Sequence, residues 1–562
     1  MINSQSFVKE KLENNASGFM NKLFFSVGLI GLIGVTAMGQ DVIRDTTDAP
    51  AKAQSRSLPD ATRIGVDVSE QVTISLRDAI EKAVDNNNDI DTVRLGRKIA
   101  DFSLKGSRGG FDPLFFSESF FEKRSTPTAS IIGGARNGLV TVETLNSNLG
   151  VSGFSGLLGG RYSVVFNSAK TNTSNQNATL NPQFPTSIAF NYTQPLLAGR
   201  FDSATRNLRI AKKNLELSDA QFKLRAIDVV SQVEQAYWDL VFSLRNLQVQ
   251  VDALKQARLQ LESNERLVEK GVLAPIEIVA ANAQITNLEQ NVYAAQVGVT
   301  TSENRLKSLI LPDRTDSFWS KALVPVSAEN LEIPRMPLSE ALKFAFENRQ
   351  ELSQVGTASE INKINEDYFR NQSRPRVDLT GTYIGSGLAG STTPQSINPS
   401  TGELRIPENL IGGYKTSLGN LFGNDYPTYR VGLTISLPFR NRQAEADLGR
   451  TMVEGDVLRN TRAQLEQLIE AEVRNSLQNL ISVESRLQAA TASRLSAEQL
   501  YESEQRQFRA GTTTAYLVFQ RQNDLVAARG REVQAQTDLN KAISNFRRSI
   551  GTTLDANGID AR

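Results

Sequence analysis

The sequence predicts an α+β membrane protein built from two tandem structural repeats, each with short strands followed by a long helical hairpin. Three observations predict this class. A segment near the beginning, ISLRDAIEKAVDNNNDI, returns as MPLSEALKFAFENRQEL, so that Leu76 recurs 262 residues later as Leu338. Two very long stretches carry the 3/4 apolar spacing of helices. Three short segments before them alternate between apolar and polar residues, as half-buried strands do.

The duplication extends along most of the chain. Pro195 in YTQPLL matches Pro438 in ISLPF at a spacing of 243, and Gly271 matches Gly511 at a spacing of 240. The drop of 19 residues from the first spacing to the second places a variable region between the opening helix and the strand ends. A repeated sequence indicates a repeated structural unit. We therefore expect repeat 1 over 72–330, repeat 2 over 331–554 and a tail over 555–562.

The composition excludes several classes of function. The 562 residues carry a net charge of +1 and contain neither cysteine nor histidine. A near-neutral chain lacks the basic surface that binds nucleic acid. Without Cys or His there is no disulfide framework, no Cys/His zinc site and no Ser/His or Cys/His catalytic pair. We expect no catalytic residue, no metal site, no cofactor and no nucleic-acid partner.

The N-terminus has the features of an export signal. Lys9, Lys11 and Lys22 precede an uncharged apolar run that ends in small residues around Gly39. This pattern predicts a signal peptide over 1–39, with a retained signal anchor as the alternative. The polar segment 40–71 is expected to be a flexible lead-in. No later stretch approaches the roughly 20 apolar residues of a transmembrane helix, so membrane attachment would have to rely on strands.

After helices expected over 75–86 and from 89 to about 110, strands are expected at about 113–121, 186–197, 375–384 and 428–438. The last is the clearest, because Tyr429, Val431, Leu433 and Ile435 point one way between polar neighbours. The alternation is poor in the first. Polar stretches rich in Gly, Asn, Ser and Thr lie between the strands of each pair, and we expect them to be long loops, 122–185 and 385–427.

Helical hairpins are expected over 201–311 and 441–551. The outgoing helix of each hairpin ends before a glycine, and a shorter helix returns from about 276 or 515. In the first hairpin an apolar stripe runs from Leu208 to Leu261 with the spacing of a coiled-coil seam. Tyr237 and Trp238 lie beside this stripe and are expected to belong to the core.

Four strands with an apolar face have the length of membrane-spanning β-strands but cannot close a barrel. At an open sheet edge in lipid, unpaired backbone N–H and C=O groups cost several kcal/mol each. Three copies would supply twelve strands, and the long helices would continue the barrel as a coiled-coil tube. Such an assembly is a conduit.

The chain resembles the TolC family of outer membrane efflux proteins over nearly all of the mature sequence. The resemblance is carried by the duplicated opening, the strand ends QPLLAGR and LPFRNR, the run VVSQVEQAYWDL, and the turns EKGVLAPIEIVAANAQ and RAGTTTAYLVFQRQNDL. It implies a homotrimer with a 12-stranded barrel in the outer-membrane lipid of a Gram-negative-type bacterium and a long periplasmic coiled-coil barrel. It also implies a passive channel that serves efflux or type I secretion with a periplasmic adaptor and an inner-membrane pump.

The resemblance places the functional positions at the hairpin tips. It implies adaptor docking at the tip residues Gly271, Val272, Leu273, Ala274, Pro275, Gly511, Thr512, Thr513 and Thr514. It implies a tunnel entrance near Glu277, Leu517, Gln520 and Asp524. Similar proteins have aspartates and an arginine at the entrance. Here Leu517 and Gln520 occupy the aspartate positions and Thr513 the arginine position, with Asp524 as a substitute carboxylate.

Two other functions compete with a channel. A periplasmic adaptor, or another coiled-coil envelope protein without channel activity, would contain a long hairpin, but with compact β domains in place of a tandem repeat. A secreted enzyme would need a catalytic constellation that this composition lacks. The motif Gly385-Ser-Gly387-Leu-Ala-Gly390 matches a dinucleotide-binding fingerprint, but the residues that follow it are typical of a loop, so we expect a coincidence.

Overall fold

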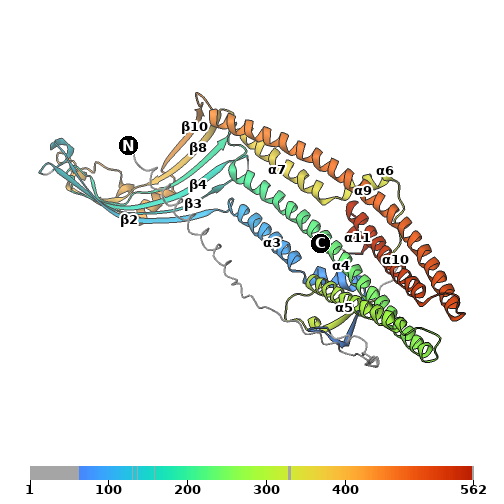
Figure 1. Ribbon diagram of the computed structural model, residues 1–562. Helices are drawn as coiled ribbons and strands as arrows, with labels where there is room; N and C mark the ends of the chain where they lie inside the picture. The colour runs from blue at the N-terminus through green and yellow to red at the C-terminus, as the bar shows by residue number, and fades with distance from the viewer. Residues whose placement is uncertain (1–62, 130, 136, 157, 327–330, 560–562) are drawn as a thin grey trace, which may run out of the picture. The chain divides into compact units, whose positions relative to one another are not determined.

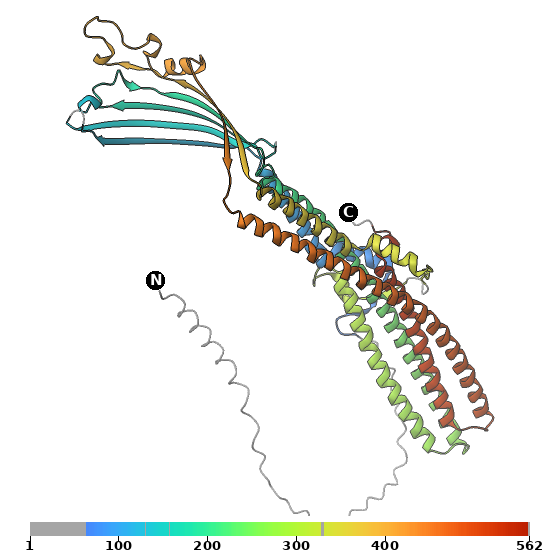
Figure 2. The ribbon, with the colours of Figure 1, turned by 90° about the horizontal axis from the view of Figure 1, so that it is seen from above.

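The computed structural model of the chain describes residues 63–129, 131–135, 137–156, 158–326 and 331–559. The predicted signal peptide 1–39 and residues 40–62 of the expected lead-in lie outside these residues. The described residues belong to the unit Pro59–Arg562. Within it a sheet of long strands leads into long antiparallel helices (Figures 1 and 2).

The two repeats share the order helix, helix, strand, strand, long helix and return helix, and each has further elements of its own. Repeat 1 contains β1 (Asp67–Ile74), α2 (Leu76–Asn86), α3 (Asn88–Gly109), β2 (Leu114–Pro127), η1 (Ile131–Gly133), β3 (Leu139–Phe154), β4 (Arg161–Thr173), β5 (Leu180–Gln183), β6 (Thr186–Pro195), α4 (Ser203–Glu269), α5 (Ile276–Ile310), η2 (Ser317–Ser320) and β7 (Lys321–Pro325). Repeat 2 contains α6 (Leu338–Asn348), α7 (Gln350–Gln372), β8 (Arg376–Gly387), β9 (Gly390–Thr392), η3 (Pro394–Ser396), η4 (Glu408–Leu410), α8 (Tyr414–Phe422), β10 (Tyr426–Ser436), α9 (Arg442–Arg509), α10 (Ala515–Ser549) and α11 (Thr553–Ala556).

The starts of three helices in repeat 1 follow from local capping. Ser75 and Asp78 form a capping box at α2, in which each side chain accepts a hydrogen bond from the backbone N–H of the other. Asn87 ends α2 and caps α3 with its side-chain oxygen. Asp202 caps the 67-residue helix α4 in the same way. These polar side chains pair backbone N–H groups that the first helical turn leaves free.

The helices form a single packed layer across the two repeats. Nearer the sheet, α3 packs on α4, α4 on α7 and α7 on α9. Farther away the order is α5, α4, α10 and α9. The largest core cluster surrounds Tyr237 and Trp238, which are 0% and 1% exposed, so the expectation that these aromatics are core residues is confirmed.

The long strands form one antiparallel sheet. In the described residues its order is β10-β8-β6-β4-β3-β2, with the short strands β5 and β9 beside this path. β6 of repeat 1 pairs with β8 of repeat 2, so the sheet joins the two repeats. Since neighbours run antiparallel throughout, strands that lead away from the helices alternate with strands that return to them.

The expectation of a long loop over 122–185 is wrong, because β3 and β4 form a long hairpin there. Asn146, Asn148 and Gly150 weaken the strand pattern of β3 in the sequence. In the sheet the amide of Asn167 donates hydrogen bonds to the side chains of Asn146 (2.9 Å) and Asn148 (2.5 Å). Pairing with β4 therefore satisfies polar side chains that made the segment resemble a loop. β2 likewise extends to Pro127, beyond the expected 121.

The equivalent region of repeat 2, 385–427, folds differently. It contains β9 and α8 in place of a long hairpin. At Gly387 a β-carbon would lie 2.1 Å from the Ser417 carbonyl oxygen, so α8 packs directly on the end of β8. At Gly390 a β-carbon would likewise lie 2.6 Å from the Pro182 carbonyl oxygen, so these two glycines of the motif serve close backbone packing. The spacing drop of 19 residues corresponds to this difference between the repeats.

A small parallel sheet closes the repeat-1 core. β1 pairs with β7, and β1 begins inside the segment 40–71 that was expected to be flexible. The neighbouring buried Lys307 donates hydrogen bonds to the carbonyls of Trp319 (2.9 Å) and Lys321 (2.7 Å) and pairs with Glu303 at 2.7 Å. Arg63 also pairs with Glu303. Glu303 and the two backbone carbonyls thus compensate the positive charge of Lys307 in the core.

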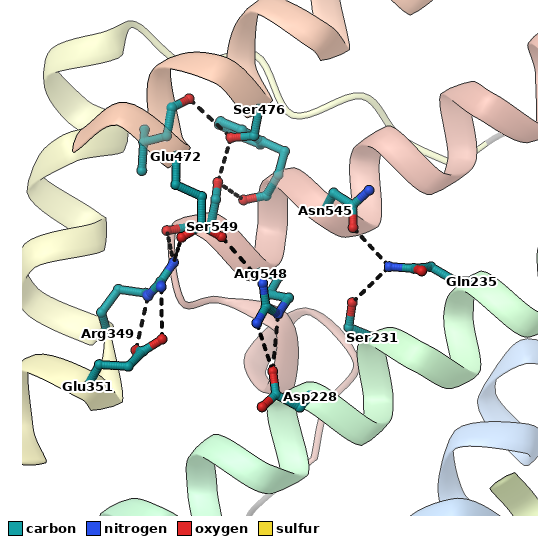
Figure 3. A network of polar contacts seen from close by, with 12 residues as sticks. Asp228, Ser231, Gln235, Arg349, Glu351, Glu472, Ser476, Asn545, Arg548 and Ser549 are labelled. Carbon is teal, nitrogen blue, oxygen red and sulfur yellow. Dashed lines mark hydrogen bonds and ion pairs between the residues drawn. The ribbon is translucent and has the colours of Figure 1, made fainter. Parts of the chain in front are cut away.

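A polar network joins the two repeats at the corner between α6 and α7 (Figure 3). The carboxylate of Glu472 accepts hydrogen bonds from Arg349 (2.9 Å) and Arg548 (3.3 Å), and Arg548 also reaches Asp228 of α4 at 2.8 Å. Burial opposes the charge on Arg349, but Glu351 and Glu472 outweigh it and raise the pKa of the guanidinium. Arg349 therefore remains charged, and the network connects α6, α9 and α10 to α4.

The buried carboxyl of Glu234 makes the stability of the fold depend on pH. It is buried in α4 and accepts hydrogen bonds from Ser544 and from Asn557 (2.9 Å). Burial raises the pKa of this carboxyl, against the opposing effects of both hydrogen bonds and Arg547. The folded chain therefore holds the proton more tightly than the unfolded chain. The contribution to stability is complete below the unfolded pKa of about 4.3 and is lost as pH rises through the folded pKa.

We expect Glu234→Gln to raise the melting temperature at pH 8 and to leave it nearly unchanged at pH 4, measured by circular dichroism in detergent. The matched control, Glu303→Gln, should destabilise the fold at pH 8 by on the order of 3 kcal/mol, because it leaves Lys307 without its buried counter-charge. A Glu234→Gln effect that is independent of pH would contradict the assignment.

Candidate functional site

The first hairpin tip, residues 271–275, is a tight helix-ending turn. The N–H of Gly271 donates to the Val268 carbonyl and the N–H of Val272 to the Leu267 carbonyl, both at 2.9 Å. These two bonds define a Schellman motif, which requires a left-handed residue. Gly271 supplies it with φ +70°. The sequence therefore ends α4 here for a local backbone reason.

The second tip, residues 511–514, repeats the same geometry with different side chains. The N–H of Gly511 donates to the Phe508 carbonyl and the N–H of Thr512 to the Gln507 carbonyl, both at 3.0 Å. Gly511 has φ +75°. The hydroxyl of Thr513 also donates to Glu504 at 2.5 Å. The two repeats therefore share the turn geometry but differ in the side chains that the turn exposes.

The two tips expose different chemistry. Around the first tip Val272, Ile276 and Val279 are each more than 60% exposed. Around the second tip the exposed residues are threonines and Tyr516, which is 70% exposed. Pro275 precedes α5, and Thr514 precedes α10. An apolar tip therefore lies beside a polar one.

The tips pack together below these turns. Ala281 of α5 contacts Ala515 and Phe519 of α10 in a small buried cluster. The amide of Gln522 donates to the Ala253 carbonyl at 3.2 Å, and Gln284 donates to Asn523 at 2.6 Å. Small alanine side chains allow this close approach. The hairpins of the two repeats are therefore held in register near the tips.

A groove of about 630 Å³ lies between the hairpins at the tips. Its apolar wall includes Leu259, Leu267, Val272, Leu273 and Phe508. Polar residues of both hairpins, among them Gln260, Gln505 and Thr513, complete the lining. Both tip turns therefore border one concave surface.

The structure brings three of the four expected entrance residues onto one helix face. Leu517, Gln520 and Asp524 follow one another at spacings of three and four along α10, and all three are exposed. The opposite face of α10 is buried through Val518 and Phe519. Glu277 lies apart from them, half-buried in the first turn of α5.

Two charged residues near the tips were missed by the sequence reasoning. Arg521 pairs with Asp524 at 3.4 Å, and Glu504 accepts the hydroxyl of Thr513. The three-residue spacing of Arg521 and Asp524 along a helix was an available signal for the first. Glu504 lies on α9, so its contact with Thr513 depends on how the turn folds back.

Tyr501 lies on α9 near the tips, and its surroundings change the pKa of its hydroxyl. Burial raises the pKa of its hydroxyl, against smaller opposing effects of Gln505, Arg529 and Arg509. Gln505 donates a hydrogen bond to the Tyr501 oxygen at 2.6 Å. Tyr501 therefore stays neutral at physiological pH and acts as a packing and hydrogen-bonding residue.

Metal-binding clusters and membrane-spanning helices are both absent from the described part of the chain. Among these residues there is no cluster of three or more Asp, Glu, His or Cys side chains with metal-binding geometry. No helix in the described ranges has the length and hydropathy required to cross a membrane.

Solved structures of outer membrane proteins share this fold. The chain superposes on CusC with a TM-score of 0.59 at 14% identity, covering 85% of this chain and 92% of CusC. For CmeC of Campylobacter jejuni the TM-score is 0.57 at 15% identity, with coverages of 85% and 86%. For VceC of Vibrio cholerae it is 0.57 at 13% identity, with coverages of 85% and 96%. A search of curated protein sequences returns no match.

A sequence model for a family described as outer membrane efflux protein matches residues 166–310 and 366–552. These segments contain 145 and 187 of the 562 residues, which is more than half of the chain. One segment falls in each repeat and includes its long helical hairpin. The resemblance drawn from the sequence is therefore confirmed, and the chain belongs to the outer membrane efflux protein family.

Proposed function

We propose that three copies of this outer membrane efflux protein form a passive conduit from the periplasm to the exterior, energised by an inner-membrane pump through a periplasmic adaptor. The main support comes from the open edges of both the sheet and the helical layer. In this proposal the protein has no catalytic role. Its work is to span the outer membrane and to dock its partners.

The sheet edges require further copies of the chain. Within the described residues β2 and β10 are the outermost long strands, each paired on one side. In hydrocarbon every free N–H or C=O costs several kcal/mol, so a spanning sheet must close. β2 leads away from the helices and β10 returns to them, so β10 of one copy can pair antiparallel with β2 of the next. Closure then leaves no edge.

The edges of the helical layer support the same ring. α3 lies at one end of the layer and exposes an apolar stripe of Leu95, Ile99 and Phe102. α9 lies at the other end and exposes apolar residues along its length, among them Val453, Val457, Leu468, Ile481 and Leu495. Such unpartnered stripes indicate helix partners. When copies form a ring, α3 of one copy meets the part of α9 nearer the sheet in its neighbour, and α5 meets the part of α9 nearer the tips.

The hairpin tips are the proposed docking surface for the adaptor. The groove between the tips offers an apolar wall with a polar rim, the usual composition of a protein interface. Val272 and Ile276 of the first tip and Tyr516 of the second add exposed anchors at its border. The entrance residues Leu517, Gln520 and Asp524 follow directly on α10, with Glu277 on α5. In this proposal, docking of the adaptor and opening of the tunnel entrance therefore involve the same helix ends.

Assembly is the first test. The protein should fractionate with the outer membrane, extract in mild detergent as a trimer and form ion-conducting channels in planar bilayers. The physical reason is that a single chain leaves both sheet edges open in lipid. A soluble periplasmic monomer would contradict the proposed conduit.

The tip turns provide a second prediction. Gly271→Ala with Gly511→Ala forces two alanines into left-handed backbone, at about 1 kcal/mol per turn. We expect amide hydrogen exchange at Val272 and Thr512 to accelerate about fivefold, since 1.4 kcal/mol corresponds to tenfold. Gly530→Ala is the matched control, because this glycine lies inside α10 with open space around it. Equal exchange in all three proteins would show that the glycines do not hold the turns.

Docking can be tested by crosslinking, because the chain has no native cysteine. A photoreactive maleimide on Val272→Cys or Thr512→Cys should form adducts with a periplasmic adaptor in cells. The same reagent on Glu454→Cys, an exposed position of α9 close to the sheet, should not. Adaptor adducts at Glu454 in place of the tips would move the docking surface away from the hairpin ends.

A further inference from the structure

We propose that β3 and β4 cross the outer membrane as part of the barrel wall, so that a trimer closes a barrel of eighteen strands with a widened polar lumen. The inference rests on the proposed trimer. The described sheet contains six long strands per chain, and three copies of six make eighteen. The sequence alone predicts four per chain and twelve in all.

The register places one apolar face across the inserted hairpin. In β4 the residues Tyr162, Val164 and Phe166 stand opposite Tyr192, Phe190 and Ile188 of β6. Directly opposite residues in an antiparallel pair share a face. On the other side of β4, Val164 stands opposite Val151 of β3 and Phe166 opposite Leu149. The apolar face of β6 therefore continues across β4 and β3.

The same face continues to both edges of the sheet. Phe190 of β6 stands opposite Tyr383 of β8, which stands opposite Tyr429 of β10. At the other edge Leu145 of β3 stands opposite Phe121 of β2. The row of Phe190 is thus apolar from Tyr429 of β10 through Val164 and Val151 to Phe115 of β2, whereas in the row of Leu145 the β4 position is Lys170.

The opposite face of β3 and β4 is polar. The Asn167 amide bonds both Asn146 and Asn148, the Asn191 amide donates to Ser163 at 3.3 Å, and the Asn148 amide donates to Glu118 at 3.4 Å. A ladder of amides and hydroxyls suits a water-filled lumen. Apolar and polar residues alternating in this way are the signature of strands in an outer-membrane barrel.

The apolar face of the sheet is suited to contact with the hydrocarbon of the membrane. In the single chain Leu145 is 56% exposed and Phe121 64% exposed. β3 and β4 contain 16 and 13 residues, more than the roughly 9–11 that a tilted spanning strand needs. The same surface on β10, with Val431 and Leu433 exposed, belongs to the strands already expected in the membrane. Continuity therefore places β3 and β4 in the same layer of lipid.

The far end of the apolar face carries a membrane-interface element. α8 packs on the ends of β6 and β8, where Leu421 contacts the position of Gly385 on the apolar face. Tyr414 and Phe422 of α8 remain exposed. Exposed aromatic residues at this height suit the boundary between hydrocarbon and headgroups.

Strand direction is compatible with the wider barrel. A hairpin adds one outgoing and one returning strand, so β2 remains outgoing and β10 remains returning. The contact between β10 and β2 of neighbouring copies is therefore antiparallel with or without β3 and β4. Because barrel diameter grows roughly linearly with strand number, eighteen strands give a barrel about 1.5 times as wide as twelve. Barrels of 16–18 strands enclose an aqueous channel, so the outer mouth suits bulky hydrophilic cargo.

Adjacent valines in β4 provide the test. Val164→Cys and Val165→Cys are labelled separately with bimane in the full-length protein, reconstituted into vesicles containing nitroxide-labelled phospholipid. We expect at least fivefold stronger quenching by lipid at 164 than at 165, and the reverse preference for a water-soluble quencher. Val431→Cys and Arg430→Cys in β10 form the reference pair, because their strand belongs to the barrel in either arrangement.

The outcomes separate the two proposals. Lipid quenching at both 164 and 431 supports the eighteen-stranded barrel. Quenching at 431 without quenching at 164 overturns it and leaves the trimeric conduit standing. The absence of lipid quenching at 431 contradicts the conduit itself.

A substitution pair tests the same point through assembly. Val164→Arg should reduce the yield of heat-resistant trimer at least about tenfold, because arginine on a lipid-facing strand is costly near the bilayer centre. Val165→Arg should assemble, because its side chain reaches the lumen. Equal yields for the two variants would overturn the assignment of β3 and β4 to the membrane.

Discussion

The fold depends on one constraint, that backbone N–H and C=O groups cannot remain unpaired in hydrocarbon. It explains why the long strands run antiparallel without interruption and why repeat 1 pairs with repeat 2 through β6 and β8. It also explains why a sheet with β2 and β10 at its ends is incomplete as a single chain. A barrel removes the last edges, and the strand directions allow copies of the chain to close it.

The helical layer of a single chain also has two open ends. Its backbone is paired within each helix, so the open ends of the layer are defined by side chains, the apolar stripes of α3 and α9. Polar contacts then fix how the repeats meet. Glu472 holds Arg349 and Arg548 together, and Asp228 carries the network to α4. These charges lie away from the lipid, where burial in protein is compensated by several hydrogen bonds.

The two copies of the repeat have diverged where the backbone leaves them free to do so. Both tips keep the Schellman turn, because a glycine with positive φ is needed to end each long helix. The side chains around it differ, apolar at Val272 and hydroxylic at Thr512. In the strand region repeat 1 has gained the hairpin β3–β4 where repeat 2 has α8. In the proposed assembly the first difference affects partner docking and the second affects the width of the barrel.

The sequence by itself determined the elements whose signals are local. The long helices, the glycine turns and the strand of Tyr429 to Ile435 follow from periodicity, capping and turn chemistry, and the core role of Tyr237 and Trp238 follows from the neighbouring stripe. Tertiary structure alone decided that β3 and β4 are strands, since Asn146 and Asn148 resemble loop residues until Asn167 lies opposite them. It also decided that Glu504 accepts the hydroxyl of Thr513 and that β1 pairs with β7. Each of these depends on a partner distant in the sequence or on side-chain rotamers, and periodicity carries no information about either.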